Sequence, residues 1–151
     1  MSVSFRTEML IQAPPAAVME AMTDLDAWPR WMPALVRVEK LTEGPFDLET
    51  RWRETRKVFG REASEVFHVT EFEPPGRLGL WVNGAEGTTG KGEYRFLYLL
   101  EPAGEGTTRV TLEGEANMPG LAARVLGFLF RGMLRKGTER DLAALRSWLE
   151  G

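Results

Sequence analysis

Cysteine is absent from this chain of 151 residues, and histidine occurs once. Without cysteine the chain can form no disulfide, no thiolate metal site and no cysteine nucleophile. A single histidine makes a transition-metal site unexpected, and no Asp-x-Asp-x-Asp-Gly spacing predicts calcium binding. The sequence therefore predicts neither a bound metal nor another cofactor.

Long apolar runs are also missing. No stretch approaches the roughly 18 uninterrupted apolar residues of a membrane span. The opening residues Met-Ser-Val-Ser-Phe-Arg-Thr-Glu lack the apolar core of a signal peptide, so a cytoplasmic protein is the simplest interpretation. Asparagine and glutamine together number three, and arginine outnumbers lysine by 15 to 4, a bias that hints at a thermophilic source.

Neither sign of charge dominates, because 19 basic residues face 22 acidic ones and the net charge is −3. This balance gives no general attraction to nucleic acid or to an anionic membrane, and no nucleic-acid partner is expected. A chain of this length is expected to form one domain, residues 1–151, and to bury about 70% of its unfolded surface.

Hydrophobic periodicity predicts a strand, two short helices, about six more strands and one long helix. The links between strands are of hairpin length, which favours an antiparallel sheet and an α+β protein. The first strand is expected over 3–12, with an ambiguous register before Met9. Helical turns are expected over 16–22 and within 28–33. The later strands are expected over 35–41, 48–58, 62–72, 78–83, 92–100 and 108–113.

The last segment, 119–149, contains no internal proline and predicts a helix about 45 Å long. One apolar stripe runs its whole length at helical spacing, and the front half carries a second. That second stripe comprises Leu121, Val125, Phe128, Leu129, Gly132 and Met133. Its possible covers are the early helices, a homodimer partner bound through Phe128, Leu129 and Met133, or a membrane surface.

Several local motifs share one resemblance. They are Trp28-Pro-Arg-Trp31-Met-Pro33, Arg51-Trp52-Arg-Glu-Thr, Val69-Thr-Glu-Phe-Glu-Pro-Pro75 and Gly106-Thr-Thr-Arg109-Val-Thr. With the element order and Leu142-Ala-Ala-Leu145 near the end, the chain resembles the START-related, polyketide cyclase/dehydrase-like (SRPBCC, birch-pollen-allergen-like) superfamily. The resemblance implies a helix-grip fold, in which a curved antiparallel sheet wraps around the long C-terminal helix. It also implies a cavity between them for an apolar or aromatic molecule, and it makes the early helices the expected cover.

Candidate cavity residues come mainly from the inward faces of the expected strands. Glu54 and Arg56 fall beside Trp52 on such a face, where they form either a polar end of a pocket, able to orient a ligand carbonyl or carboxylate, or an ion pair at a frayed strand end. The aromatic residues are either cavity wall or plain core. His68 lacks an obvious acidic partner in the sequence and is weak as a general base. The expected cavity lining is Trp31, Trp52, Glu54, Arg56, His68, Tyr94, Phe96, Tyr98, Phe130 and Leu134.

The glycine-rich segment 84–92 is not a phosphate loop. That motif requires glycine at position 85 and serine or threonine at 92, where this chain has Ala85 and Gly92. The segment also leads into a strand rather than a helix. It is expected to be a mobile hairpin loop, with a lid as its functional interpretation.

The preferred function is binding of a hydrophobic small molecule, such as a lipid, polyketide or quinone, for transport, sensing or storage. One alternative is a cyclase or dehydratase, with Glu54 and either His68 or Tyr98 as its acid and base. Another is a protein-interaction module that uses the second stripe of the last helix, which predicts an exposed apolar patch and no cavity.

Overall fold

The computed structural model describes residues 2–151, except the side chains of 121–126. Seven strands form one antiparallel sheet in the order β1-β7-β6-β5-β4-β3-β2 within the described residues. The strands are β1 (Ser2–Ile11), β2 (Leu35–Lys40), β3 (Arg51–Val58), β4 (Arg61–Glu73), β5 (Arg77–Asn83), β6 (Glu93–Pro102) and β7 (Thr108–Asn117). The helices are α1 (Pro15–Thr23), η1 (Leu25–Arg30), η2 (Gly84–Glu86) and α2 (Leu121–Glu150).

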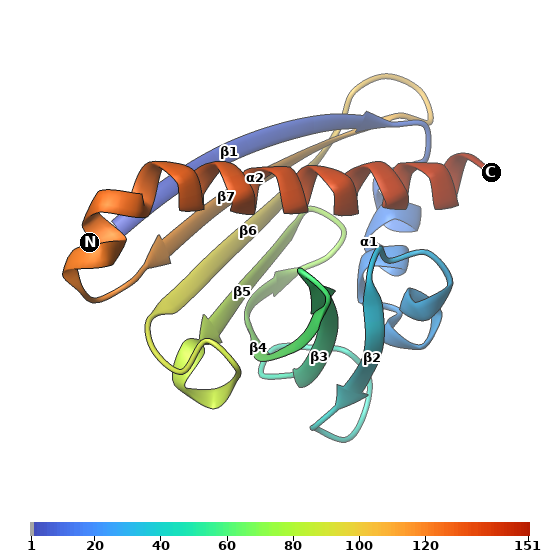
Figure 1. Ribbon diagram of the computed structural model, residues 1–151. Coiled ribbons are helices and arrows are strands. Elements are labelled where there is room, and N and C mark those ends of the chain that lie inside the picture. The colour runs from blue at the N-terminus through green and yellow to red at the C-terminus, as the bar shows by residue number, and fades with distance from the viewer. Residues whose placement is uncertain (1) are drawn as a thin grey trace.

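The long helix α2 crosses the concave side of the curved sheet (Figure 1). It packs mainly against β1 and α1, at one border of the sheet. Leu142 and Leu145 join Val18 and Met19 of α1 in the main hydrophobic core. The middle of α2 therefore spans the concave face without resting on it.

Three expected strands differ from the structure, one of them because β7 continues past 113 to Asn117. Pairing of β1 with β7 is continuous, so the expected register ambiguity is wrong. Thr7 is buried on the same face as Phe5 and Ile11, which keeps a strict period of two. The strand expected over 48–58 begins only at Arg51, because a turn precedes it. There the N–H of Thr50 donates to the Asp47 carbonyl at 3.1 Å.

The second apolar stripe of α2 is not covered by the early helices, so that expectation is wrong. Phe128 and Leu129 are 76% and 67% exposed. The short helices instead close one end of the sheet. In η1, Trp28 is buried and donates its Nε1–H to the Ala21 carbonyl at 3.3 Å. The side chains of Leu121 and Val125, also assigned to this stripe, lie outside the described residues.

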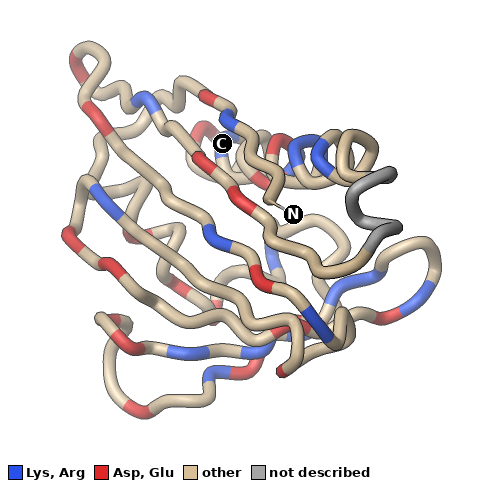
Figure 2. Tube along the Cα trace, turned by 90° about the vertical axis from the view of Figure 1, so that its left-hand side faces the viewer, with Lys and Arg blue, Asp and Glu red and all other residues tan. Residues whose placement is uncertain are grey.

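The convex face of the sheet is charged. Acidic and basic residues are interspersed along its strands (Figure 2). This arrangement agrees with solvent exposure of one sheet face and burial of the other. The site must therefore be sought on the concave side.

Candidate functional site

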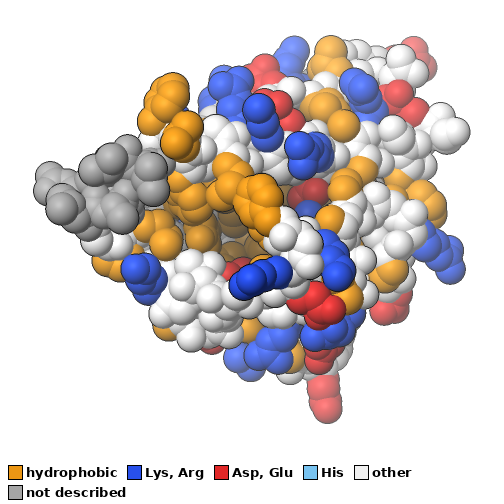
Figure 3. Space-filling view, viewed as in Figure 1, with side chains coloured by type: hydrophobic (Ala, Val, Ile, Leu, Met, Phe, Trp, Pro, Cys, Tyr) orange, Lys and Arg blue, Asp and Glu red, His pale blue; other side chains and the backbone are white. Residues whose placement is uncertain are grey.

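A cavity of about 490 Å³ lies between the concave face and α2. Its volume falls in the usual range for small-molecule sites. The space-filling view shows a hollow below α2, lined largely by hydrophobic side chains (Figure 3). Its walls come from η1, the strands β3 to β6, the loop after η2, and α2.

A row of aromatic rings forms the sheet side of this cavity. The ring centroids of Tyr94 and Phe96 are 6.5 Å apart, and those of Phe96 and Phe67 are 6.4 Å apart. Phe67 stacks on Trp52 at 5.3 Å with an interplanar angle of 1°. Trp28 then meets Trp52 edge-on at 5.3 Å. Inward side chains of neighbouring strands line up because the side-chain period is two.

A charged cluster interrupts the apolar wall. Arg56 of β3 donates from Nε to Glu54 Oε2 at 2.7 Å and from Nη1 to Asp141 Oδ1 of α2 at 2.8 Å. Its Nη2 lies 2.9 Å from the Met32 sulfur. Trp52 donates its Nε1–H to Glu54 Oε1 at 3.1 Å. These contacts fix the guanidinium, so the expected ion pair reaches across the cavity to the helix.

The cluster contains one cation and two carboxylates. Burial alone would lower the pKa of Arg56, but Glu54 and Asp141 outweigh burial and raise that pKa. Burial raises the pKa of Asp141, and Arg56 offsets only part of this rise. Burial, followed by the charges of Asp141 and Glu54, also raises the pKa of Tyr98, which keeps its phenol protonated. With both carboxyls ionised, the cluster carries one uncompensated negative charge.

A second polar group lies where the glycine-rich segment meets the cavity. Thr89 donates its N–H to Glu65 Oε1 at 3.0 Å, and its hydroxyl bonds to the same oxygen. The Tyr94 hydroxyl lies 3.5 Å from the Thr89 hydroxyl. Burial raises the pKa of Tyr94, although its contact with Thr89 acts in the opposite direction.

The glycine-rich segment, expected from the sequence to be a mobile hairpin loop, makes backbone hydrogen bonds to β4 and within itself. Thr88 donates its N–H to the Ser64 carbonyl at 2.7 Å, and Ser64 donates back to the Thr88 hydroxyl at 2.8 Å. Gly90 donates to the Gly84 carbonyl at 2.7 Å. Gly87 packs so closely on β4 that an added Cβ would overlap the Ser64 carbonyl oxygen.

The structure brings nine of the ten expected residues to this cavity: Trp31, Trp52, Glu54, Arg56, Tyr94, Phe96, Tyr98, Phe130 and Leu134. His68 is not among them. The inward residues of this part of β4 are Ala63, Glu65 and Phe67, so His68 points to the outer face. There its Nε2 lies 2.8 Å from Glu86 Oε1, a partner 18 residues away that the sequence did not reveal.

Sequence reasoning missed Asp141, Glu65 and Thr89. Asp141 had a detectable signal, since it lies seven residues after Leu134 on a helical stripe that is otherwise apolar. Glu65 had none, because the two faces of its strand are alike in polarity. Among the described residues no cluster of His, Cys, Asp or Glu could hold a metal ion.

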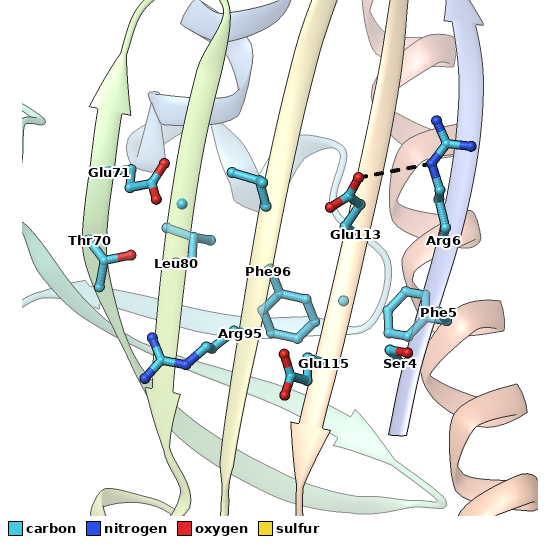
Figure 4. A pocket seen from close by; sticks show the side chains of 13 residues that line it. Ser4, Phe5, Arg6, Thr70, Glu71, Leu80, Arg95, Phe96, Glu113 and Glu115 are labelled. Atoms are coloured by element: carbon cyan, nitrogen blue, oxygen red, sulfur yellow. Dashed lines mark ion pairs between the residues drawn. The ribbon is translucent and has the colours of Figure 1, made fainter. Parts of the chain in front are cut away.

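A second hollow, about 620 Å³, lies on the outer face of the sheet (Figure 4). Its polar lining includes Arg95, Glu113 and Glu115, which are exposed. Leu80 and Phe96 border both hollows because the sheet between them is a single layer. Its charged and exposed side chains suit water better than an apolar ligand, so the concave cavity is the candidate site.

The curved sheet, the long helix and the cavity between them together define a helix-grip protein of the START-related superfamily, as the sequence motifs implied. Residues 2–150 match the family described as polyketide cyclase / dehydrase and lipid transport, and the chain belongs to that family. The comparison with curated protein sequences found no match.

Solved structures share this fold at low sequence identity. TTHA0849 from Thermus thermophilus superposes with a TM-score of 0.79 at 21% identity, covering 96% of this chain and 95% of that one. The Zhui aromatase/cyclase from Streptomyces sp. R1128 superposes with a TM-score of 0.81 at 14% identity, and the match covers 99% of this chain and 94% of that one. A START superfamily protein from Mycobacterium smegmatis superposes with a TM-score of 0.77 at 16% identity. The match covers 99% of this chain and 97% of that one.

Proposed function

We propose that this protein binds a hydrophobic, largely aromatic small molecule in the cavity under α2, for transport, sensing or storage. The observation that carries the proposal is the aromatic row facing a cavity of about 490 Å³ that is open to solvent on one side. Burial of apolar ligand surface there contributes about 25 cal/mol per Å². A lipid, a polyketide or a quinone has the required apolar area.

The charged cluster restricts which polar groups the ligand can carry. Arg56 already donates to Glu54 and Asp141, and it contacts Met32. A ligand carboxylate would add a third negative charge beside a single cation, which disfavours it in a poorly solvated site. A hydroxyl or phenol that donates to Asp141 fits better. This preference replaces the ligand carboxylate considered from the sequence alone.

The second candidate is a cyclase or dehydratase acting on a polyketide-like substrate. The observation that favours it is the convergence of Glu54, Arg56, Asp141 and Tyr98 on one cavity. Acid–base chemistry requires a group whose pKa approaches the working pH, and burial raises the pKa of Asp141 in that direction. His68, considered earlier for this role, lies on the other face. The interaction-module alternative predicted no cavity, whereas the structure has one.

Native mass spectrometry of protein purified from its own host tests the binding proposal. The expected result is a small molecule of near-unit stoichiometry that organic extraction removes. Chemical change of that molecule by the extracted protein, abolished in Asp141→Asn, would instead support the enzyme.

A matched pair of variants locates the bound molecule. Leu134→Trp fills the cavity, whereas Leu97→Trp places the same side chain on the outer face of β6. The first variant should lose the ligand and also the binding of the neutral probe N-phenyl-naphthylamine, while the second retains both. Equal behaviour of the two variants, or no binding of any molecule by the wild type, would reject the proposal.

A further inference from the structure

Two segments that are far apart in the sequence, the β3–β4 hairpin and part of α2, border the opening, or mouth, of the cavity. Val58 and Met133 both line the cavity and are 44% and 46% exposed, so each lies where the cavity meets solvent. Val58 ends β3 at the β3–β4 hairpin, and Met133 lies on α2. The open side of the hollow is visible in Figure 3, with Lys and Arg side chains around it.

The β3–β4 hairpin carries an aromatic residue, Phe59, at a turn position whose backbone conformation disfavours bulky side chains. Val58 pairs with Arg61, and the two residues between them, Phe59 and Gly60, have φ angles of 50° and 79°. A two-residue turn with both φ values positive favours Asn-Gly, and a bulky residue there is strained. Phe59 is nevertheless 89% exposed, so the strain is not compensated by packing within this chain. Strain of this kind points to a role outside the fold.

The part of α2 that borders the mouth carries both apolar and basic side chains. Leu129, Met133, Lys136 and Arg140 follow one another at spacings of four, three and four residues, which places them on one stripe of α2. Met133 fixes this stripe at the mouth because it lines the cavity. Leu129 is also exposed, and it continues the apolar part of the stripe.

Positive charge surrounds the apolar tips. Arg61 pairs with the cavity-lining Val58 at the hairpin, and Lys136 and Arg140 follow Met133 on the helix. None of these three forms an ion pair with a described side chain. The neighbouring Glu62 is already engaged by Arg37 at 3.3 Å. A protein with a net charge of −3 thus concentrates unpaired cations at one opening.

We propose that the mouth docks on an anionic phospholipid membrane, with Phe59, Leu129 and Met133 entering the interface and the three cations contacting lipid phosphates. Exposed apolar side chains beside basic ones are the combination that binds such surfaces. A second copy of this chain fits less well, because a two-fold contact would set the same cations against each other. No helix among the described residues can cross a membrane, so docking is peripheral.

Co-sedimentation with vesicles tests this surface without any cavity ligand. The extracted protein should bind vesicles of phosphatidylcholine mixed with phosphatidylglycerol, should bind phosphatidylcholine alone weakly, and should dissociate as salt is raised. Phe59→Asn should lower binding, as should the pair Lys136→Glu and Arg140→Glu, the latter on the order of tenfold or more. The controls are Leu10→Asn, which also replaces an exposed apolar side chain with asparagine, and Arg109→Glu with Arg146→Glu, which reverses the same number of charges elsewhere.

Two outcomes would overturn the proposal. One is equal loss of binding in the mouth variants and in their controls. The other is a lack of vesicle binding together with a dimer in light scattering that Leu129→Ser dissociates, which would assign the surface to a second copy. Binding of N-phenyl-naphthylamine by Phe59→Asn should stay unchanged, so failure here is distinguishable from failure of the cavity proposal.

Discussion

Arg56 lies on a strand and Asp141 on the last helix, 85 residues later, and their side chains meet at 2.8 Å inside the cavity. This contact joins the floor of the cavity to its roof. Because Arg56 also holds Glu54 at 2.7 Å, any change at one member alters the charge balance of all three. The first two predictions follow from this balance.

Replacing Arg56 with methionine should destabilise the fold by about 2–3 kcal/mol at neutral pH, because two buried carboxylates lose their shared cation. Without that cation the pKa of Asp141, which burial already raises, should rise further, so the variant should lose stability as the pH increases and recover it in acid. Urea denaturation at several pH values measures both effects. Arg53→Met, on the outward face of the same strand, should change stability by no more than about 0.5 kcal/mol. A matching loss in Arg53→Met would contradict this account.

Asp141→Asn should behave differently from Arg56→Met. Burial holds the pKa of Asp141 above its ordinary value of 3.8 in the folded state. A carboxyl with a raised folded pKa lowers stability once it ionises, so the wild type should lose stability relative to Asp141→Asn as the pH rises above 3.8. The comparison requires denaturation curves of both proteins across the acid range. A difference that stays constant with pH would show that Asp141 does not titrate in this way.

Gly87→Ala should loosen the loop after η2. The added Cβ would overlap the Ser64 carbonyl oxygen and lie 2.9 Å from the Glu65 Cα, neither of which can move alone. Overpacking of this kind costs about 1–3 kcal/mol. Gly76→Ala is the control, because there a Cβ meets its nearest atom, the Leu100 carbonyl oxygen, at 3.7 Å. Thermal unfolding should separate the two variants; similar midpoints would mean that the loop yields without cost.

Phe59→Asn should stabilise the fold by about 1 kcal/mol, since asparagine tolerates the positive φ that strains phenylalanine. Phe59→Val should destabilise it, because a β-branched side chain tolerates this conformation least. Chemical denaturation of the three proteins checks the order. If phenylalanine proved the most stable of the three, Phe59 would be a folding determinant and the argument from strain would fail.

Much of the sheet side of the cavity could be predicted from the sequence, because alternation along a strand shows which residues share a face. On β3, Trp52, Glu54 and Arg56 alternate with Arg53, Thr55 and Lys57, and on β6 Tyr94, Phe96 and Tyr98 share one face. In each case a period of two identifies the inward side, whatever lies opposite.

The roof and the mouth were harder to predict, because they depend on how elements are placed against one another. The helical stripe marks Asp141 as an inward residue of α2, but its pairing with Arg56 depends on where α2 lies over the sheet, which no local pattern specifies. On β4 the register shifts between Val69 and Glu71, so a single extended alternation could not describe that strand. For the same reason the sequence wrongly predicted that His68 lines the cavity, whereas it lies on the outer face.

No backbone-to-backbone hydrogen bond joins α2 to another element in the described part of the chain. The helix keeps its own ladder and the sheet keeps its ladder, and the two are attached through side chains. Moving the helix away from the sheet would therefore open the cavity without breaking the backbone hydrogen bonds within either element. We expect the proposed ligand to leave by a motion smaller than unfolding, so slow amide exchange in the sheet should coexist with rapid exchange of that ligand.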